Sequence, residues 1–439
     1  MTPTPVDLLI EARWIIPVEP DNTTFEHHAI AVHDGRIVAV LPIAEARTRF
    51  AATETVSLPD HIVTPGFVNL HCHAAMTLMR GLADDLPLMR WLQEAIWPAE
   101  SRHASHAFVR DGSLLAAAEM LRGGITTCND MYFFPEATAE AFARLGLRGV
   151  LGITVIEFPS QYAADADDYL RKGLEARDAW RDNPLIRFAL APHAPYTVSN
   201  KSFERIGALA DELELPIHIH IHETAGEVAD SVREFGQRPV ARLESLGLLG
   251  PSLIGVHAVH LDTEDIERLA IHQCAIAHCP TSNMKLASGA APVASLLDRQ
   301  LAVGLGSDGA ASNNRLDLLR EMRQASLLAK LQTSDAATLP AHQALRMATL
   351  GGARALGLDA EIGSIEPGKA ADIAALRIDD PDELPCYHPA SHLIHVLDRR
   401  AVSDVWVGGQ RRVKHGKLLQ ITNTELLGIA RLWQNKLRQ

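Results

Sequence analysis

The sequence predicts an α/β protein in which a (β/α)8 barrel of the TIM type is joined to a small, discontinuous β-sandwich domain. Between residues 64 and 357, eight short apolar segments are each followed by helical sequence, and this alternation over about 290 residues has the length of one such barrel. Residues 1–63 and 358–439 carry short β-prone runs and turn signals instead. We therefore expect a barrel over residues 64–357 and one composite domain made from residues 1–63 and 358–439.

The composition narrows the class of protein and of partner. The chain has 439 residues, of which 47% are hydrophobic and 22% are charged, as is typical of a globular protein with a sizeable core. Its net charge of −13 argues against a nucleic acid or an anionic membrane as the main partner. Five cysteines without a CxxC pair, together with the lack of a signal peptide or a membrane span, predict a cytoplasmic protein.

The first 63 residues read as strands and turns. Residues 7–10 and 29–32 are β-prone, and Asp34 with Gly35 gives a strong turn signal before the β-prone residues 36–40. The same style returns near the carboxyl end, where turns and strands are predicted over the ranges 363–369, 371–376 and 402–413, followed by a short amphipathic helix over 425–437.

Eight strands are predicted for the barrel. They lie within residues 64–73, 125–128, 149–155, 188–191, 215–220, 253–257, 275–278 and 301–308. The predicted helices cover about 105–122, 136–145, 165–181, 201–213 and 314–356. Residues 76–100, after the first strand, form an excursion far longer than a usual βα connection, and such excursions are commonly functional.

A pair of histidines ends the first predicted strand. His71 and His73 are two residues apart, so in an extended chain both imidazoles point to the same side and can reach one point. Neutral imidazole is a common ligand of first-row metals. The pair alone fits two partly exposed loop histidines equally well, so the interpretation depends on residues further along the chain.

The fifth and eighth predicted strands supply those residues. His218, His220 and His222 alternate along strand five, so only the ones nearest its carboxyl end reach the barrel mouth. Asp308 closes strand eight. The carboxyl ends of the strands are where such barrels keep their chemistry, and a mixed set of imidazoles and one carboxylate suits Zn²⁺ or Fe²⁺.

A catalytic metal leaves a position open for water and lowers the pKa of that water towards neutrality. Glu223, three residues after His220, is a natural proton carrier beside such a site, although it also fits an acid at a helix N-terminus. His257 follows strand six and is placed to hold the charge that develops on the attacking oxygen. His260 is interpreted as a surface or core histidine.

Longer motifs identify a family. The chain resembles the amidohydrolase superfamily, in the branch of aminohydrolases that includes methylthioadenosine and S-adenosylhomocysteine deaminases and the triazine chlorohydrolases. The resemblance covers nearly the full length and rests on the motifs at residues 65–100, 191–197, 217–224, 257–261, 278–293 and 306–314.

The resemblance implies a role for particular residues. It implies that the metal ligands are His71, His73, His220 and Asp308, and that the catalytic residues are Glu223, His257 and Asp308. For the substrate it implies contacts from Trp91, Glu100, Arg148, His193, Glu223 and Asp308. Among these, Trp91 would pack on the substrate and Glu100 would hold the ribose hydroxyls, because a carboxylate can accept two hydroxyl hydrogen bonds.

Two positions vary from the family pattern. His222 stands where some relatives have a smaller residue, so the pocket wall beside Glu223 is expected to differ. Residues 188–193 of strand four contain no lysine, whereas binuclear members of the superfamily use a carboxylated lysine there. We therefore expect one divalent ion per chain, zinc or alternatively iron.

The resulting hypothesis is a hydrolase acting on a C–N bond of a cyclic amidine. The leading function is hydrolytic removal of the 6-amino group of 5′-methylthioadenosine or S-adenosylhomocysteine. The expected partner is this small-molecule substrate, and the enzyme is expected to be a homo-oligomer. The alternative is an aminohydrolase or chlorohydrolase acting on a free guanine- or triazine-like ring, for which a ribose-binding Glu100 would have no purpose. A non-enzymatic barrel would be expected to lose ligands, and the zinc signature of cytidine deaminases is absent.

Overall fold

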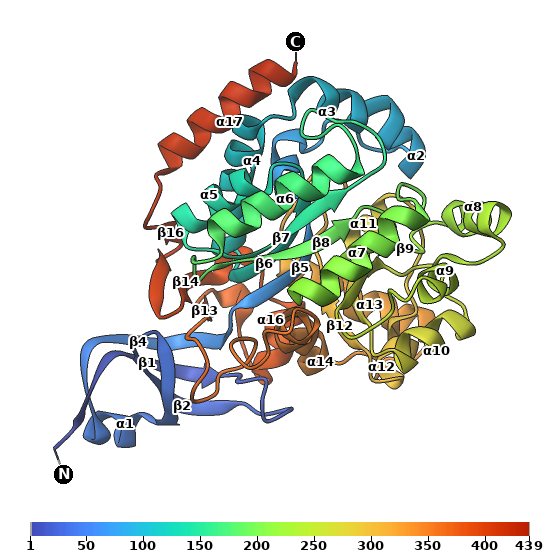
Figure 1. Cartoon of the computed structure of the whole chain (residues 1–439). Helices are drawn as coiled ribbons and strands as arrows, with labels where there is room; N and C mark the ends of the chain where they lie inside the picture. Colours follow the sequence, from blue (N-terminus) through green and yellow to red (C-terminus); the bar gives the residue numbers. More distant parts are fainter. Residues whose placement is uncertain (1, 439) are drawn as a thin grey trace.

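Eight parallel strands form the central sheet of the computed structural model, which describes residues 2–438 (Figure 1). Their order along the sheet is their order along the chain, as expected when each strand is followed by a helical crossover. The strands are β5 (Phe67–Cys72), β6 (Ile125–Tyr132), β7 (Arg148–Val155), β8 (Ile186–Pro192), β9 (Ile217–Ile221), β10 (Leu253–His257), β11 (Ala275–His278) and β12 (Ala302–Leu305). The predicted barrel is thus confirmed.

The sheet closes on itself through the segment that follows β12. The Asp308 N–H donates to the carbonyl oxygen of His71 at 3.0 Å, and the Ser307 N–H donates to Asn69 Oδ1 at 2.8 Å. The Asn69 amide in turn donates to Ser307 Oγ at 2.7 Å. Backbone and side-chain bonds therefore join the last strand to the first at the carboxyl end of the barrel.

Helices cover the outside of the barrel. Many begin at a residue that accepts a backbone N–H with its side chain, as Ser105, Asp165 and Ser199 do, and this satisfies donors that the first turn leaves free. The helices between the strands are α4 (His106–Arg122), α5 (Pro135–Leu145), α6 (Ala166–Trp180), α7 (Asn200–Leu213), α8 (Ala225–Phe235), α9 (Pro239–Ser245), α10 (Thr263–Ile271), α11 (Pro280–Lys285) and α12 (Val293–Asp298). After β12 come α13 (Leu318–Thr333), α14 (Ala341–Arg346), η3 (Met347–Gly351) and α15 (Gly352–Ala355).

The long excursion after β5 folds into short helical pieces beside the barrel mouth. These are η1 (Ala74–Met79), α2 (Leu88–Trp91), the π-helical turn η2 (Leu92–Ile96) and α3 (Trp97–His103). A single π turn inside helical sequence often marks a functional site.

The second sheet is built from both ends of the chain, as predicted (Figure 1). Its order is β16-β15-β14-β13-β4-β1-β2-β3, and the two halves meet where Val63 pairs with Ala375. The strands are β1 (Thr4–Ile15), β2 (Phe25–His33), β3 (Arg36–Pro42), β4 (Phe50–Pro65), β13 (Ile373–Arg377), β14 (Val402–Val407), β15 (Gln410–Lys414) and β16 (Lys417–Leu418). The sequence did not single out α1 (Ile43–Arg49) or the long β4, whose first half is largely exposed and polar.

The carboxyl-terminal region also returns to the barrel. Helix α17 (Asn423–Leu437) lies against α4, where the Trp433 indole N–H donates to Asp111 Oδ2 at 2.8 Å. Helix α16 (Pro389–His395) is tied to α13 by the Arg323 guanidinium, which donates to the Ile394 carbonyl at 2.9 Å. The domain boundaries at residues 63 and 358 stay a prediction. No helix among residues 2–438 is long and apolar enough to cross a membrane.

Gly306 tests how tightly the closure is packed. A methyl group at this position would lie 2.8 Å from both the Cys279 sulfur and the His71 Cβ, so Gly306→Ala is expected to lower the free energy of unfolding by about 1–3 kcal/mol. Denaturant unfolding measures this change. The control is Gly428→Ala in α17, where nothing lies within 4 Å of the added methyl group and stability should stay constant or rise by up to about 1 kcal/mol. Equal effects at the two positions would contradict tight packing at Gly306.

Candidate metal and active site

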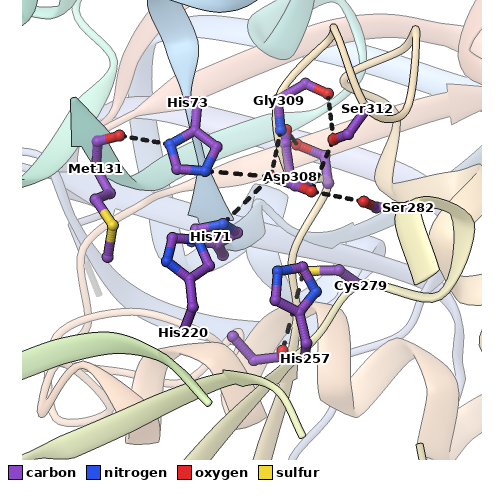
Figure 2. Close-up of polar contacts among 12 residues, drawn as sticks. His71, His73, Met131, His220, His257, Cys279, Ser282, Asp308, Gly309 and Ser312 are labelled. Carbon is purple, nitrogen blue, oxygen red and sulfur yellow. Dashed lines mark hydrogen bonds and ion pairs between the residues drawn. The ribbon is translucent and has the colours of Figure 1, made fainter. Parts of the chain in front are cut away.

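The four residues predicted as metal ligands converge at the carboxyl end of the barrel (Figure 2). The side chains of His71, His73 and His220 offer nitrogen atoms that lie within 4.8 Å of one another. Asp308 Oδ1 is 3.3 Å from His71 Nε2 and 3.4 Å from His73 Nε2. Strands β5, β9 and β12 thus bring three imidazoles and one carboxylate to one point.

Backbone carbonyls on neighbouring strands fix two of the imidazoles. His73 Nδ1 lies 2.6 Å from the Met131 carbonyl oxygen, and His220 Nδ1 lies 2.6 Å from the His193 carbonyl oxygen. A carbonyl oxygen can only accept, so both Nδ1 atoms carry the proton and both Nε2 atoms present a lone pair. Figure 2 shows the Met131 contact of His73.

The third imidazole has a nitrogen in need of a partner. His71 is fully buried, its Nδ1 lies 3.0 Å from His218 Nε2, and its Nε2 has no hydrogen-bond partner. Burial lowers the pKa of His71 to about 3, so the ring is neutral at physiological pH. A buried nitrogen of this kind costs free energy unless something binds it, and a divalent metal is a suitable occupant.

Asp308 is held as a carboxylate. Its Oδ2 accepts the hydroxyl protons of Ser282 at 2.6 Å and Ser312 at 2.7 Å, and its Oδ1 accepts the Gly309 N–H at 2.7 Å. Burial opposes the charge, but His71 and the other surrounding imidazoles outweigh it and hold the pKa of Asp308 well below its ordinary value. Sequence reasoning missed both serines, although they lie in motifs at 278–293 and 306–314.

A cavity of about 530 Å³ opens above this set. All the other predicted site residues except Arg148 line it, namely Trp91, Glu100, His193, Glu223 and His257. Trp91 and Glu100 come from the excursion after β5, whereas His193, Glu223 and His257 follow or end barrel strands. One pocket therefore joins the metal set to the residues predicted to contact substrate.

Glu223 and His257 face each other beside the metal set. Glu223 Oε2 is 3.8 Å from His257 Nε2, and His257 Nδ1 lies 2.8 Å from Asn283 Oδ1. Burial raises the pKa of Glu223. Burial also works against a charge on His257, but Glu223 and Asp308 outweigh it and raise the pKa of this histidine.

Glu227 positions the loop that carries Glu223, and sequence reasoning did not identify it. The Glu227 carboxylate accepts the N–H groups of His222 and Glu223, which lie five and four residues earlier in the chain, at 2.8 Å each. This arrangement fixes the backbone from which the Glu223 side chain enters the pocket.

At the other side of the pocket, Glu100 pairs with β6. Its Oε1 accepts a hydrogen bond from the Tyr132 hydroxyl at 2.7 Å. Tyr132 directly follows Met131, whose carbonyl oxygen orients His73. Burial raises the pKa of Glu100 to about 7 against the opposing effect of this hydrogen bond. His193 Nδ1 lies 3.1 Å from Thr197 Oγ1, and burial lowers the pKa of His193 to about 4, so this ring is neutral.

Arg148 was wrong as a substrate contact. It is the first residue of β7, at the amino end of the strand, whereas the pocket lies at the carboxyl ends. Its guanidinium donates to both carboxylate oxygens of Asp372 at 3.2 Å, which joins the barrel to the second sheet.

His222 is not among the residues that line the cavity, and its φ is 52°. The expected difference from relatives at this position stays a prediction. The Nε2 atom of His222 accepts the Val240 N–H at 3.1 Å, so its Nδ1 carries the proton and donates to the His260 carbonyl at 3.1 Å. The ring therefore connects the end of β9 to the first turn of α9 and to the segment after β10.

Comparisons with known proteins agree with this geometry. The amidohydrolase family model matches residues 62–412. Relatives from Teredinibacter turnerae and Saccharophagus degradans, both described as 5-methylthioadenosine/S-adenosylhomocysteine deaminases, are each 44% identical to the chain. Each match covers 99% of this chain and 98% of the relative.

Solved structures show the same fold. The crystal structure of an adenosine deaminase from Xanthomonas campestris with bound zinc has a TM-score of 0.98 and 48% identity, and the match covers 99% of both chains. The atrazine chlorohydrolase from Arthrobacter aurescens, also complexed with zinc, has a TM-score of 0.90 and 26% identity, over 97% of this chain and 99% of the other.

Removal of one ligand should separate metal binding from folding. His73→Ala and Asp308→Ala are each expected to lower metal affinity by about tenfold or more and to abolish turnover, while unfolding stays cooperative. Metal content after dialysis, turnover and thermal unfolding measure the three effects. The exposed His388, replaced by Ala, is the control and should retain metal. Full metal retention by His73→Ala would remove this residue from the ligand set.

Proposed function

Because the chain belongs to the amidohydrolase family, we propose that it is a metal-dependent hydrolase that removes the 6-amino group of an adenosine-type thioether nucleoside. The substrate would be 5′-methylthioadenosine or S-adenosylhomocysteine, and the products the inosine analogue and ammonia. The observation that carries the proposal is the pocket that joins three imidazoles and Asp308 to two acids, the buried Glu223 and the half-buried Glu100. The names of the near-full-length relatives support the substrate class.

His71, His73, His220 and Asp308 would hold the metal. We propose one ion per chain, because β8 has no lysine to bridge a second, and zinc, because the structure at 48% identity contains it. When bound, such an ion lowers the pKa of a water molecule towards neutrality and so supplies the nucleophile.

Glu223 and Asp308 would transfer the protons. Glu223 would give a proton to N1 of the purine ring as water adds to C6, and burial, which raises the pKa of this carboxyl group, favours the protonated form that this step needs. His257, whose Nε2 faces Glu223, would hold the attacking oxygen in place. Asp308 would then take a proton from this oxygen and pass it to the amino group, which leaves as ammonia.

The far part of the pocket would bind the sugar. Trp91 would pack on the nucleoside, His193 would contact it as a neutral ring, and the Glu100 carboxylate would accept hydrogen bonds from two ribose hydroxyls. We propose that the enzyme acts as a homo-oligomer in the cytoplasm.

The similarity to an atrazine chlorohydrolase favours one alternative, an aminohydrolase or chlorohydrolase acting on a guanine- or triazine-like ring. Glu100 argues against it. A half-buried carboxyl group whose pKa is raised to about 7 is costly to keep beside a ligand that has no hydroxyl groups to offer.

Glu223→Gln tests the proposed reaction. The variant is expected to retain one metal ion per chain and to lose about a hundredfold or more in kcat, because an amide cannot give a proton to N1. Loss of adenine-type absorbance with 5′-methylthioadenosine gives the rate, and elemental analysis gives the metal content. Loss of metal from the variant would make Glu223 structural instead, and two ions per active wild-type chain would contradict a mononuclear site.

Glu100→Ala tests the nucleoside as substrate. Loss of a charged hydrogen-bond acceptor is expected to cost about 1.5–3 kcal/mol, or about ten- to a hundredfold in kcat/KM, with a nucleoside. Activity on a free adenine-like base, which does not reach Glu100, should hardly change. Equal losses on both would indicate a general defect, and a wild-type preference for the free base or a chlorinated triazine would support the alternative function.

A further inference from the structure

The outer part of the substrate pocket has no positive charge. Among residues 2–438, those that line the cavity include no lysine and no arginine, and the ionisable acids among them are Glu100, Glu223 and Asp308. Any group that a substrate carries beyond its ribose therefore meets no lysine or arginine among the residues that line the cavity.

The outer wall is mainly apolar. Trp97 of α3 and Phe158 of the segment after β7 meet edge to face with ring centroids 6.3 Å apart, and Leu88 lines the cavity with them. Phe158 is 44% exposed, which places this wall at the solvent opening. Such a surface favours a small apolar substituent, whose transfer from water is favourable.

The polar side chains at this wall are already engaged. Ser160 Oγ accepts the Tyr162 N–H at 3.0 Å, and the Gln161 amide donates to the Ser101 carbonyl oxygen at 3.1 Å. Both bonds fix the segment after β7, and neither side chain carries a charge that could pair with a charged ligand.

The cations of the surrounding segments have partners elsewhere. Arg148 is bonded to Asp372 at the opposite end of the barrel. Arg80 pairs with Glu119, Arg90 with Glu94 at 2.8 Å, and Lys285 with Asp84 at 2.6 Å, while Arg102 donates to the Pro98 carbonyl at 3.3 Å. None of these side chains lines the cavity.

We infer that this site selects adenosine-type nucleosides whose 5′ substituent is small and uncharged, such as a methylthio group, over S-adenosylhomocysteine. The inference rests on the proposed function and specifies its substrate class. The amino-acid end of S-adenosylhomocysteine carries an ammonium group and a carboxylate, and the carboxylate finds no lysine or arginine among the described residues that line the cavity. An unpaired charge must either stay in water, where it adds no binding energy, or lose its hydration without compensation.

Three nucleosides separate charge from length. Relative to 5′-methylthioadenosine, kcat/KM should be at least about tenfold lower for S-adenosylhomocysteine and within about threefold for 5′-butylthioadenosine, which has a similar length without charges. Equal rates with S-adenosylhomocysteine would overturn the inference while leaving the proposed function intact. An equally slow butylthio substrate would overturn it too, because length would then be the cause. Failure of all three would instead contradict the proposed function.

A cation introduced at the opening should weaken the preference. Gln161→Lys adds an ammonium group on the exposed part of the pocket lining, and Gln161→Met is the uncharged control of similar length. The ratio of kcat/KM for S-adenosylhomocysteine to that for 5′-methylthioadenosine should rise about threefold to tenfold in the lysine variant, and less at high salt. It should not rise in the methionine variant. A rise with both variants, or with neither, would contradict the role assigned to charge.

Discussion

The bond between the last and the first strand of the barrel is the constraint on which the site depends. The Asp308 N–H donates to the His71 carbonyl, so the same contact that closes the sheet joins two proposed metal ligands. Gly306 allows this approach, because any side chain there would meet His71 and Cys279. A change in the closure therefore changes the position of the ligands, and folding and metal binding are linked through one short segment.

The strands that supply no ligand also have a defined purpose. The carbonyls of Met131 in β6 and His193 after β8 receive the Nδ1 protons of His73 and His220, and this leaves each Nε2 free. The main chain thus decides which nitrogen of each ring is available to a metal. Such bonds hold the rings in one orientation before any ligand arrives, which lowers the cost of binding.

The eight apolar segments and the polar residues that follow them could be interpreted from the sequence, because strand periodicity and the carboxyl-end rule are local properties. These features predicted the barrel and the meeting of His71, His73, His220 and Asp308. The β-prone runs at both chain ends predicted the second sheet. The motif at residues 65–100 likewise predicted that Trp91 and Glu100 would line the pocket.

The sequence by itself therefore determined the fold and the proposed ligands, since each of these follows from a residue's place on one strand. Only the tertiary structure decided where long or turned side chains go. Arg148 pairs with Asp372, the residue before β13. His222 bonds to Val240 and His260 and does not line the pocket. The tertiary structure also decided the hydrogen bond from Ser282 to Asp308 and the bond by which Glu227 holds the Glu223 backbone. Such contacts depend on how loops meet in space, which spacing along the chain does not specify.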